Sequence, residues 1–490
     1  MQLKIKIIRR MRRIIRPFVV LLSAALLMVS CLESDDYSDY VFYSDTAITS
    51  FSLGTLKQTV WTKASDGVTD SSYVADLDAS GYDFYIDQLK KEIYNPDSLP
   101  KGTDAAHVLC NISSKNGGIV LLVHKNIEGE DSLAYYSSSD SIDFTEPREF
   151  RVLANDGMAL RSYTVRVNVH KEHPDSINWH DMGVCQAFTS MTGGMKAAVL
   201  PSRLLVFGSD MTGTSVYSTS TSGSLAWERL ETNISLDGNA CSNVVVKGDY
   251  VYTIDGGTVV RSADGKTWTA VGGTGIRQLL AAGKHNIYAI DADGDMAASA
   301  DDGATWAKDG VIGDMSMIPT DNVNYGSFAL STNDDAERVI ITGNRDMDNS
   351  AFAEDSVAMV WSKIEEYSDG SRKHSWMPYN ENNGFRLPRM ASLGVTVYGD
   401  ILLALGGRGL GTSTAEAFAH FYVSKDNGLT WHADDSYYLP ENFTNGDGDV
   451  FTMTADSDNY LWIICGGTGQ VWRGRLNRLG WENEQTSFEE

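Results

Sequence analysis

Two segments of this 490-residue chain each carry an arginine that could bind an anion, and the first also carries two aspartates. The first segment is Asn344-Arg345-Asp346-Met347-Asp348-Asn349, and the second is Arg408-Gly409-Leu410-Gly411. Each follows an apolar run that ends in glycine. A guanidinium is planar and binds carboxylates and sulfates through paired hydrogen bonds. These residue types favour recognition of an acidic glycan or a peptide terminus.

Further polar residues lie in segments that lead into other apolar runs, and Arg389 is one of them. The candidate ligand-binding residues are Arg277, Tyr325, Arg345, Asp346, Arg386 and Arg408. The alternative is that the arginines form ordinary surface ion pairs with the abundant carboxylates nearby.

Calcium is a further chemical possibility, because Asp291–Asp295 and Asn445–Asp449 space several oxygen ligands closely. An EF-hand requires Gly at position six and Glu at position twelve, where the first run has Met296 and Asp302. The Asp-Gly pairs in both runs are typical of tight hairpin turns, so we expect turns and no metal or other cofactor.

The cysteines other than Cys31 share no metal-ligand spacing, and we expect buried free thiols. They are Cys110, Cys185, Cys241 and Cys465. A disulfide between Cys185 and Cys241 stays open at this stage.

One motif recurs and indicates how these residues are positioned. Its copies are Ser299-Ala-Asp301-Asp-Gly303-Ala-Thr305-Trp306, Ser424-Lys-Asp426-Asn-Gly428-Leu-Thr430-Trp431, and the shorter Ser262-Ala-Asp264-Gly265-Lys-Thr267-Trp268. The Asp can accept bonds from nearby backbone N–H groups, the Gly permits a positive φ, and the Trp can be buried. The pattern resembles the Asp-box turn of β-propellers such as sialidases, which implies an architecture and not an activity.

Six apolar runs repeat along the second half of the chain, and each is followed by a second strand-like segment and then a tryptophan. The runs begin at Leu204, Val251, Ile287, Val339, Leu402 and Trp462, and the tryptophans are Trp227, Trp268, Trp306, Trp376, Trp431 and Trp481. Short strands in a repeated unit predict a six-bladed β-propeller. The last two runs end in Gly406-Gly407 and Gly466-Gly467, and these two copies resemble kelch repeats. Trp179 marks either an outer strand that closes the ring or a seventh blade.

In the first part of the chain apolar and polar residues alternate as in the strands of a β-sandwich, for example in Ala47–Leu53 and Tyr163–Val169. The turn signal Ala154-Asn155-Asp156-Gly157 precedes the last of these strands. Together with Phe144-x-x-Pro147, this pattern resembles the Ig-like modules of Bacteroidota surface proteins. The resemblance implies a spacer.

Residues 1–30 are predicted to form a removable export signal. Seven basic residues precede an apolar stretch, Phe18–Val29, that is too short to span a bilayer. The stretch ends in Leu27-Met28-Val29-Ser30-Cys31, which resembles a bacterial lipoprotein signal with Met28 where Leu is usual. This implies lipid attachment at Cys31, with an ordinary secretory signal as the alternative. The acidic tether that follows resembles surface-export signals, which implies an outer-membrane protein facing the exterior.

The charge of the chain excludes one class of partner. Residues 1–30 hold seven of the 40 Lys and Arg residues and none of the 65 Asp and Glu residues, so removing them moves the net charge from −25 to −32. Such a field repels nucleic acid.

A sialidase is the sharpest enzymatic alternative, because Phe385-Arg386-Leu387-Pro388 resembles the arginine motif of that family. In sialidases this motif precedes the Asp-boxes, whereas here it follows two of them. No Tyr nucleophile with an assisting Glu can be assembled either.

We therefore expect an all-β chain with a signal peptide at 1–30, a tether at 31–40, an Ig-like β-sandwich at 41–172 and a β-propeller at 176–490. The sequence favours a non-catalytic propeller that binds a glycan or protein. A glycoside hydrolase and a scaffold subunit of an outer-membrane complex remain as alternatives. The chain resembles propeller lipoproteins of Bacteroidota, many of which are tied to glycan use or host contact.

Overall fold

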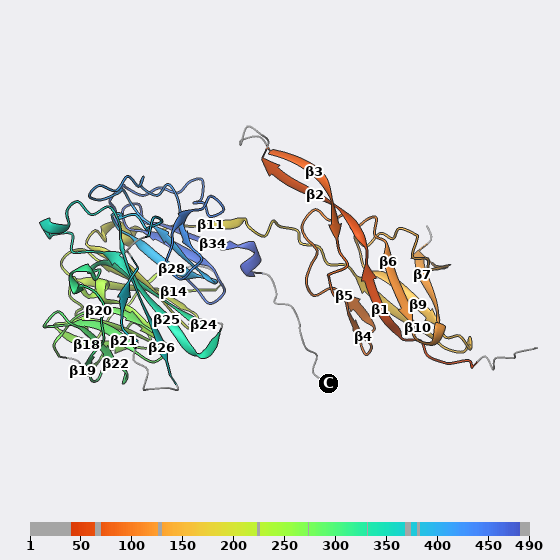
Figure 1. The fold of residues 1–490 in the computed structure, drawn as a ribbon, viewed down its shortest axis with the longest axis horizontal. Coiled ribbons are helices and arrows are strands. Elements are labelled where there is room, and N and C mark those ends of the chain that lie inside the picture. Colours follow the sequence, from red (N-terminus) through yellow and green to blue (C-terminus); the bar gives the residue numbers. More distant parts are fainter. Residues whose placement is uncertain are drawn as a thin grey trace, which may run out of the picture. The chain divides into compact units, whose positions relative to one another are not determined.

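The computed structural model describes residues 41–63, 70–125, 130–222, 226–272, 274–330, 332–367, 374–379 and 383–480. The chain divides into two compact units, Met1–Lys171 with Asn483–Glu490, and Glu172–Glu482. Over the described ranges the fold is all-β, with short 3-10 helices between strands (Figure 1). No helix in these ranges is long and apolar enough to cross a membrane. The predicted signal peptide, the tether with Cys31, and Trp481 lie outside the described residues.

The first unit packs a short sheet against a six-stranded one. In the short sheet, β1 (Ile48–Leu53) pairs with β6 (Cys110–Ser114). The larger sheet has the order β4 (Tyr85–Asp87), β5 (Glu92–Tyr94), β10 (Leu160–Arg166), β9 (Arg148–Leu153), β7 (Ile119–Lys125), β8 (Asp131–Tyr135). Apolar residues of both sheets form one buried cluster, which includes Phe51, Phe150 and Tyr163. A separate hairpin joins β2 (Thr55–Lys63) to β3 (Asp70–Asp78).

The turn predicted at Ala154–Gly157 connects β9 and β10, which pair antiparallel. The Gly157 N–H donates to the carbonyl of Ala154, and Gly157 has a φ of +71°. Glycine adopts this backbone conformation without strain. This local prediction is confirmed.

The second unit contains six four-stranded antiparallel sheets among its described residues, numbered here in chain order. The first three are β12 (Gly194–Leu200), β13 (Arg203–Ser209), β14 (Thr214–Ser220), β15 (Glu228–Arg229); β16 (Val245–Lys247), β17 (Tyr250–Asp255), β18 (Thr258–Ser262), β19 (Thr269–Gly272); and β20 (Ile276–Ala282), β21 (Ile287–Asp291), β22 (Met296–Ser299), β23 (Ala307–Lys308). The last three are β24 (Asp321–Leu330), β25 (Asn333–Asn344), β26 (Met359–Glu366), β27 (Met377–Pro378); β28 (Gly394–Tyr398), β29 (Ile401–Leu405), β30 (Tyr422–Ser424), β31 (His432–Ala433); and β32 (Phe451–Ala455), β33 (Leu461–Cys465), β34 (Gln470–Leu476), β11 (Ile177–Val184). The 3-10 helices are η1 (Lys115–Gly117), η2 (Gln186–Ser190), η3 (Ala240–Asn243), η4 (Met315–Met317), η5 (Ser350–Phe352) and η6 (Asn477–Gly480).

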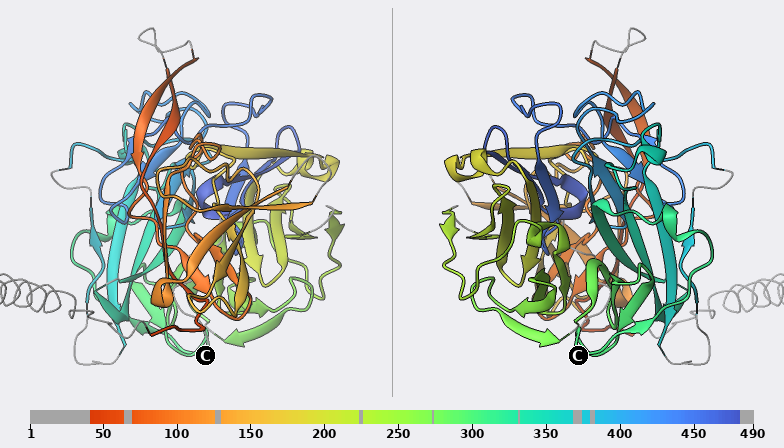
Figure 2. Two further views of the ribbon diagram at one scale, coloured as in Figure 1. Left: turned by 90° about the vertical axis from the view of Figure 1, so that its right-hand side faces the viewer. Right: turned by 90° about the vertical axis from the view of Figure 1, so that its left-hand side faces the viewer.

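The first strands of these sheets contact one another in a closed ring. Contacts run from β12 through β16, β20, β24 and β28 to β32, and β32 contacts β12. In the right-hand view of Figure 2, the sheets follow one another from yellow through green to blue around the unit. The sixth sheet joins both ends of the unit, because β11 pairs with β34 and places Trp179 opposite Gly474. The second unit is therefore a β-propeller, as the repeats predict, and Trp179 lies on a closing outer strand.

The six apolar runs of the sequence correspond to the second strand of each sheet. These strands are β13, β17, β21, β25, β29 and β33. The side chains of β29 and β33 are buried throughout. A strand buried on both faces reads as a continuous apolar run, which explains why these strands are visible in the sequence.

The three repeat turns, residues 262–268, 299–306 and 424–431, connect the third and fourth strands of their sheets. In the second turn the Asp301 carboxylate accepts from Thr305 N and Ser299 Oγ, both at 2.8 Å, and Trp306 Nε1 donates to the carbonyl of Gly303 at 3.0 Å. The third copy repeats these bonds, with Asp426 in the place of Asp301. Hydrogen bonds from Thr305 lower the pKa of Asp301 to about 2.

Each repeat turn also packs against the preceding sheet. A Cβ on Gly265 would lie 2.9 Å from Leu205 of the first sheet, and one on Gly428 would lie 3.1 Å from Val360 of the fourth. Trp268 and Trp431 are buried, whereas Trp306 is only partly buried. The turns therefore join neighbouring sheets.

Candidate functional site

A cavity of about 380 Å³ lies where the first strands of the sheets begin. Its walls come from the start of β12, from η3, and from the start of β20, β24, β28 and β32. Met347 and Leu410 of the two long polar segments also line it. The two segments follow the second strands of the fourth and fifth sheets, β25 and β29. Because these strands run antiparallel to the first strands, they end at the face where the first strands begin, which is the face of the cavity.

The polar side chains of the cavity wall are mainly neutral amides and hydroxyls, in particular Ser242, Gln278, Asn322, Asn324, Ser392 and Thr452. Several hold the wall in place. Thr452 Oγ1 accepts from Ala197 N at 2.7 Å, Gln278 Nε2 donates to the carbonyl of Thr320 at 2.8 Å, and Asn324 Nδ2 donates to that of Leu393 at 3.0 Å. Each bond joins two different sheets or their loops, so the wall is built before any ligand arrives.

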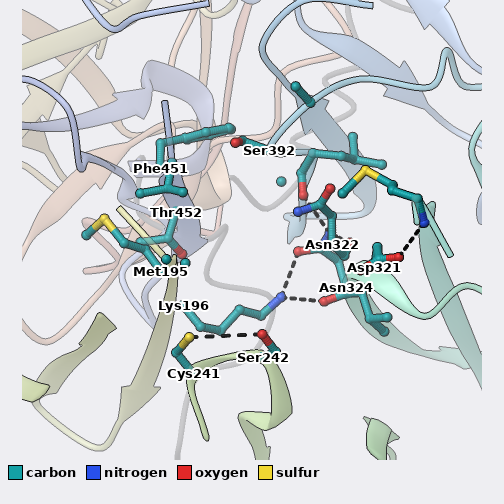
Figure 3. Close-up of a pocket in the computed structure, with 18 of the residues that line it drawn as sticks. Met195, Lys196, Cys241, Ser242, Asp321, Asn322, Asn324, Ser392, Phe451 and Thr452 are labelled. Carbon is teal, nitrogen blue, oxygen red and sulfur yellow. Dashed lines mark hydrogen bonds between the residues drawn. The ribbon is translucent and has the colours of Figure 1, made fainter. Parts of the chain in front are cut away.

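Lys196 is the cation of the cavity lining. Its side chain extends from β12, and its Nζ donates to the carbonyl of Val323 and to Asn324 Oδ1, each at 2.8 Å (Figure 3). These acceptors belong to β24 of the fourth sheet, opposite the first in the ring of six. Burial disfavours the ammonium and lowers the pKa of Lys196 to about 8.

Asp321 is the carboxylate of the cavity lining, and it is fixed within the rim. Its Oδ2 accepts from Met347 N at 2.8 Å. Burial raises the pKa of Asp321, and the nearby carboxylates of Asp346 and Asp348 raise it further. Buried Asn344 supports the same rim, because its Nδ2 donates to Asn322 Oδ1 and to the carbonyl of Met390, at 3.0 and 2.9 Å.

The candidate residue Arg345 has an internal partner. Its Nε and Nη2 donate to the two oxygens of Asp355, each at 2.7 Å, and its guanidinium lies 3.8 Å from the ring centroid of Phe352. Buried Arg389 supports the same segment by donating to the carbonyl of Phe352. Both arginines therefore stabilise the loop that follows β25, Arg345 through an ion pair with Asp355 and Arg389 through a backbone carbonyl.

Tyr325 also makes internal contacts. Its hydroxyl accepts from Val246 N at 2.7 Å and lies 3.3 Å from Val246 O. Burial raises the pKa of Tyr325 to about 12. Tyr325 is thus a packing residue between the second and fourth sheets.

The four other candidates are exposed, and within the described residues no hydrogen bond or ion pair joins any two of them. Arg277 precedes Gln278 of the cavity wall, and Asp346 accepts from Asp348 N within its own turn. Arg386 lines a separate shallow depression with Thr412–Glu416 and His420. The backbone N–H of Arg408 donates to the carbonyl of Asp447. None of the six candidates is among the residues that line the cavity.

Residues 173–484 match the family described as the DUF6242 beta propeller domain. The chain belongs to the DUF6242 family. Residues 51–167 match that family's N-terminal domain, described as a domain of unknown function. No curated protein matches the DUF6242 chain.

Several solved structures are weakly similar to this DUF6242 protein. The N-terminal domain of Nup159 has a TM-score of 0.31 and 8% identity, over 61% of this chain and 96% of that one. The Niastella koreensis GH74 enzyme has a TM-score of 0.31 and 14% identity, over 66% of this chain and 47% of that one. The Xanthomonas campestris gluconolactonase XC5397 has a TM-score of 0.34 and 15% identity, over 61% of this chain and 95% of that one.

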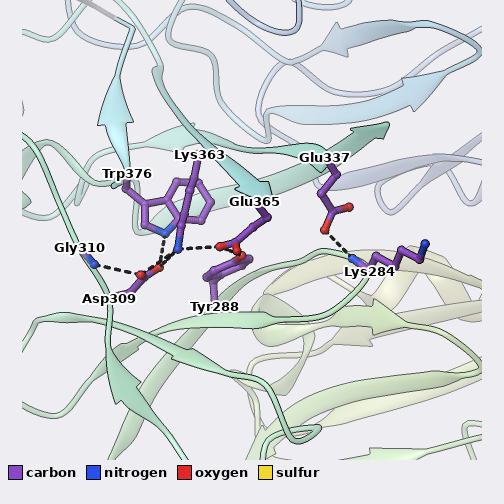
Figure 4. A network of polar contacts seen from close by, with 8 residues as sticks. All are labelled: Lys284, Tyr288, Asp309, Gly310, Glu337, Lys363, Glu365 and Trp376. Atoms are coloured by element: carbon purple, nitrogen blue, oxygen red, sulfur yellow. Dashed lines mark hydrogen bonds and ion pairs between the residues drawn. The ribbon is translucent and has the colours of Figure 1, made fainter. Parts of the chain in front are cut away.

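A second polar cluster of the DUF6242 propeller joins the third and fourth sheets (Figure 4). Lys363 Nζ lies 2.6 Å from Asp309 and 2.7 Å from Glu365. Asp309 also accepts from Trp376 Nε1 at 3.0 Å, and Glu365 accepts from the Tyr288 hydroxyl at 2.6 Å. The side chains of Lys363, Asp309 and Glu365 are 7%, 14% and 16% exposed. These charges have internal partners, so the cluster is structural.

The two aspartate-rich runs make turn hydrogen bonds. Asp291 Oδ1 accepts from Asp293 N and Asp295 N, and Asp449 Oδ2 accepts from Gly446 N. Within the described ranges, no group of three or more His, Cys, Asp or Glu side chains is arranged to hold a metal. All four described cysteines are free thiols, so the disulfide considered between Cys185 and Cys241 is not formed. Cys110, Cys241 and Cys465 are buried as expected, whereas Cys185 is only partly buried.

The sequence interpretation missed the residues that line the cavity, above all Lys196. Lys196 stands in Gly193-Gly194-Met195-Lys196-Ala197, where a lysine opens an otherwise small and apolar strand. A charged residue at the start of a ring-forming strand is the one signal that could have marked it.

Proposed function

We propose that this DUF6242 protein is a non-catalytic binding protein and that its central cavity takes a polar ligand about the size of a sugar unit. The observation that carries the proposal is a cavity of about 380 Å³ whose wall presents mainly amides and hydroxyls from several sheets. Ligand pockets fall in this size range. Phe451 and Met195 add apolar surface beside these polar groups.

The lining favours binding over hydrolysis. Most glycoside hydrolases need two carboxylates that flank the scissile bond, and among the described residues that line the cavity Asp321 is the one carboxylate. The sialidase-like segment does not supply another group, because Arg386 faces a separate depression and Leu387 is buried.

The wider proposal places the binding domain on a cell surface. A lipid at Cys31 would anchor the chain in the outer membrane of a Bacteroides-like bacterium, facing outward, and an Ig-like module would act as a spacer. Each of the six sheets would be one blade, and the repeat turns would be Asp-boxes. Replacing Cys31→Ser should release the chain from the membrane fraction, and retention there would contradict the anchor.

A glycan array with the full chain tests the binding function. Ser242→Trp fills the cavity from η3, whereas Ser316→Trp places the same side chain on η4, outside the cavity. Both serines are exposed, so both variants should fold. We expect glycan binding that Ser242→Trp abolishes and Ser316→Trp retains. Binding that both variants retain would place the site elsewhere, and no binding at all would favour the scaffold alternative.

A further inference from the structure

Lys196 places a positive charge inside a cavity that is otherwise lined mainly by neutral polar groups. The side chain leaves β12 and reaches the start of β24, where Nζ donates to Val323 O and Asn324 Oδ1 (Figure 3). An ammonium has three N–H donors, and these two bonds use two of them. One donor is left for a ligand.

None of the described carboxylates forms an ion pair with this ammonium. Over the described part of the chain, no Asp or Glu oxygen lies within 4.0 Å of Lys196 Nζ, although ion pairs of this kind occur elsewhere in the propeller, as at Lys363. The two acceptors of Lys196 are a carbonyl and an amide, and both are neutral. Asp321, on the same cavity wall, is bonded to Met347 N.

We propose that the ligand is an acidic sugar whose carboxylate binds to Lys196 Nζ. The inference rests on the proposed function and names the chemical class of its ligand. One carboxylate oxygen accepts the remaining N–H of Lys196, and the hydroxyls and amides of the wall serve the sugar hydroxyls. A charge-assisted hydrogen bond is about twice as strong as a neutral one, so the carboxylate fixes the orientation of the sugar.

The test compares matched acidic and neutral sugars with the full chain by titration calorimetry. The probes are glucuronate against glucose and galacturonate against galactose, which differ only at the carboxylate. We expect the wild-type chain to bind the uronates at least about tenfold more tightly. Lys196→Met should remove this preference and retain the binding of neutral sugars.

A second variant keeps the test decisive if Lys196→Met fails to fold. Ser242 is exposed on the cavity wall, so Ser242→Asp introduces a carboxylate there without burying one. It should also remove the preference for uronates, while Ser316→Asp, outside the cavity, should leave it unchanged.

The pH dependence gives an independent readout. Burial lowers the pKa of Lys196 to about 8, so the uronate preference should be present at pH 7 and decline as the pH rises through about 8. The other titratable groups of the wall are Cys241 and Asp321, and burial raises the pKa of both. Ionisation of the Cys241 thiol would add negative charge and act in the same direction, so Cys241→Ser serves as the control. Its profile should match that of the wild-type chain.

The outcomes separate this inference from the proposed function. Equal binding of acidic and neutral sugars would overturn the inference and leave the proposed function intact. A uronate preference that survives both Lys196→Met and Ser242→Asp would overturn the role of Lys196. If no sugar of either kind binds, both proposals fail.

Discussion

Replacing Lys363→Met should destabilise the propeller strongly, because it removes the cation from a buried cluster of charges. Lys363 lies between Asp309 and Glu365 at 2.6 and 2.7 Å, and all three side chains are less than one-fifth exposed. Methionine keeps most of the length of the side chain. The main change is that two carboxylates lose their counter-charge inside the protein.

The expected cost follows from the burial of this cluster. Removing one partner of a buried ion pair costs about 3–5 kcal/mol, because the remaining charge is left without compensation. The unit Glu172–Glu482 should unfold with an entropy of roughly 0.65 kcal/mol/K, at about 2.1 cal/mol/K per residue. The melting temperature should therefore fall by about 5–8 °C.

Differential scanning calorimetry of the full chain measures this shift, and Lys308→Met is the matched control. Lys308 pairs with Asp295, but the two side chains are 69% and 46% exposed, so solvent screens the pair and we expect no measurable change. If Lys363→Met lowers the melting temperature no more than Lys308→Met does, the cluster is not an energetically buried ion network and the reasoning is refuted.

Other predictions concern the repeat turns and the loop after β25. The pKa of Asp301 is about 2 in the folded chain and 3.8 ordinarily, so its contribution to folding stability is present above pH 4 and is lost on acidification towards pH 2. Asp301→Asn should flatten that part of the stability–pH profile in urea titrations, and an unchanged profile would contradict the assignment. Gly265→Ala should cost more stability than Gly294→Ala, because both have positive φ but only Gly265 lacks room for a Cβ; the strain alone is about 1–3 kcal/mol, and equal melting temperatures would show that packing contributes nothing. Arg345→Ala should lower stability by about 1–3 kcal/mol because it leaves Asp355 unpaired, with glycan binding retained; loss of binding at unchanged stability would restore Arg345 as a ligand residue.

Local patterns in the sequence were sufficient for much of the fold. The run Leu402–Leu405 is apolar because β29 is buried on both faces, and the Asp426, Gly428 and Trp431 pattern specifies a turn whose bonds span only a few residues. The Asn155-Asp156-Gly157 turn is likewise confirmed. In each case the interaction that selects the structure lies within a short stretch of chain.

The candidate site was less predictable, because charge and residue type do not reveal a partner. Arg345 is a residue type that binds anions, but Asp355 lies ten residues away and accepts from its Nε and Nη2. Tyr325 was expected in a segment leading into a strand, but it lies within β24, and its hydroxyl bonds to the backbone of another sheet. Exposure and pairing decide which polar residues are available to a ligand.

The sequence by itself determined the all-β class, the repeat of apolar second strands and the turns that join neighbouring sheets, because strand period and turn chemistry act over a few residues. Only the tertiary structure decided where a ligand could bind. Lys196 meets Val323 across 127 residues of chain, and Ala197 meets Thr452 across 255. The cavity exists because the ring of first strands closes, and that closure brings together side chains that share no local pattern.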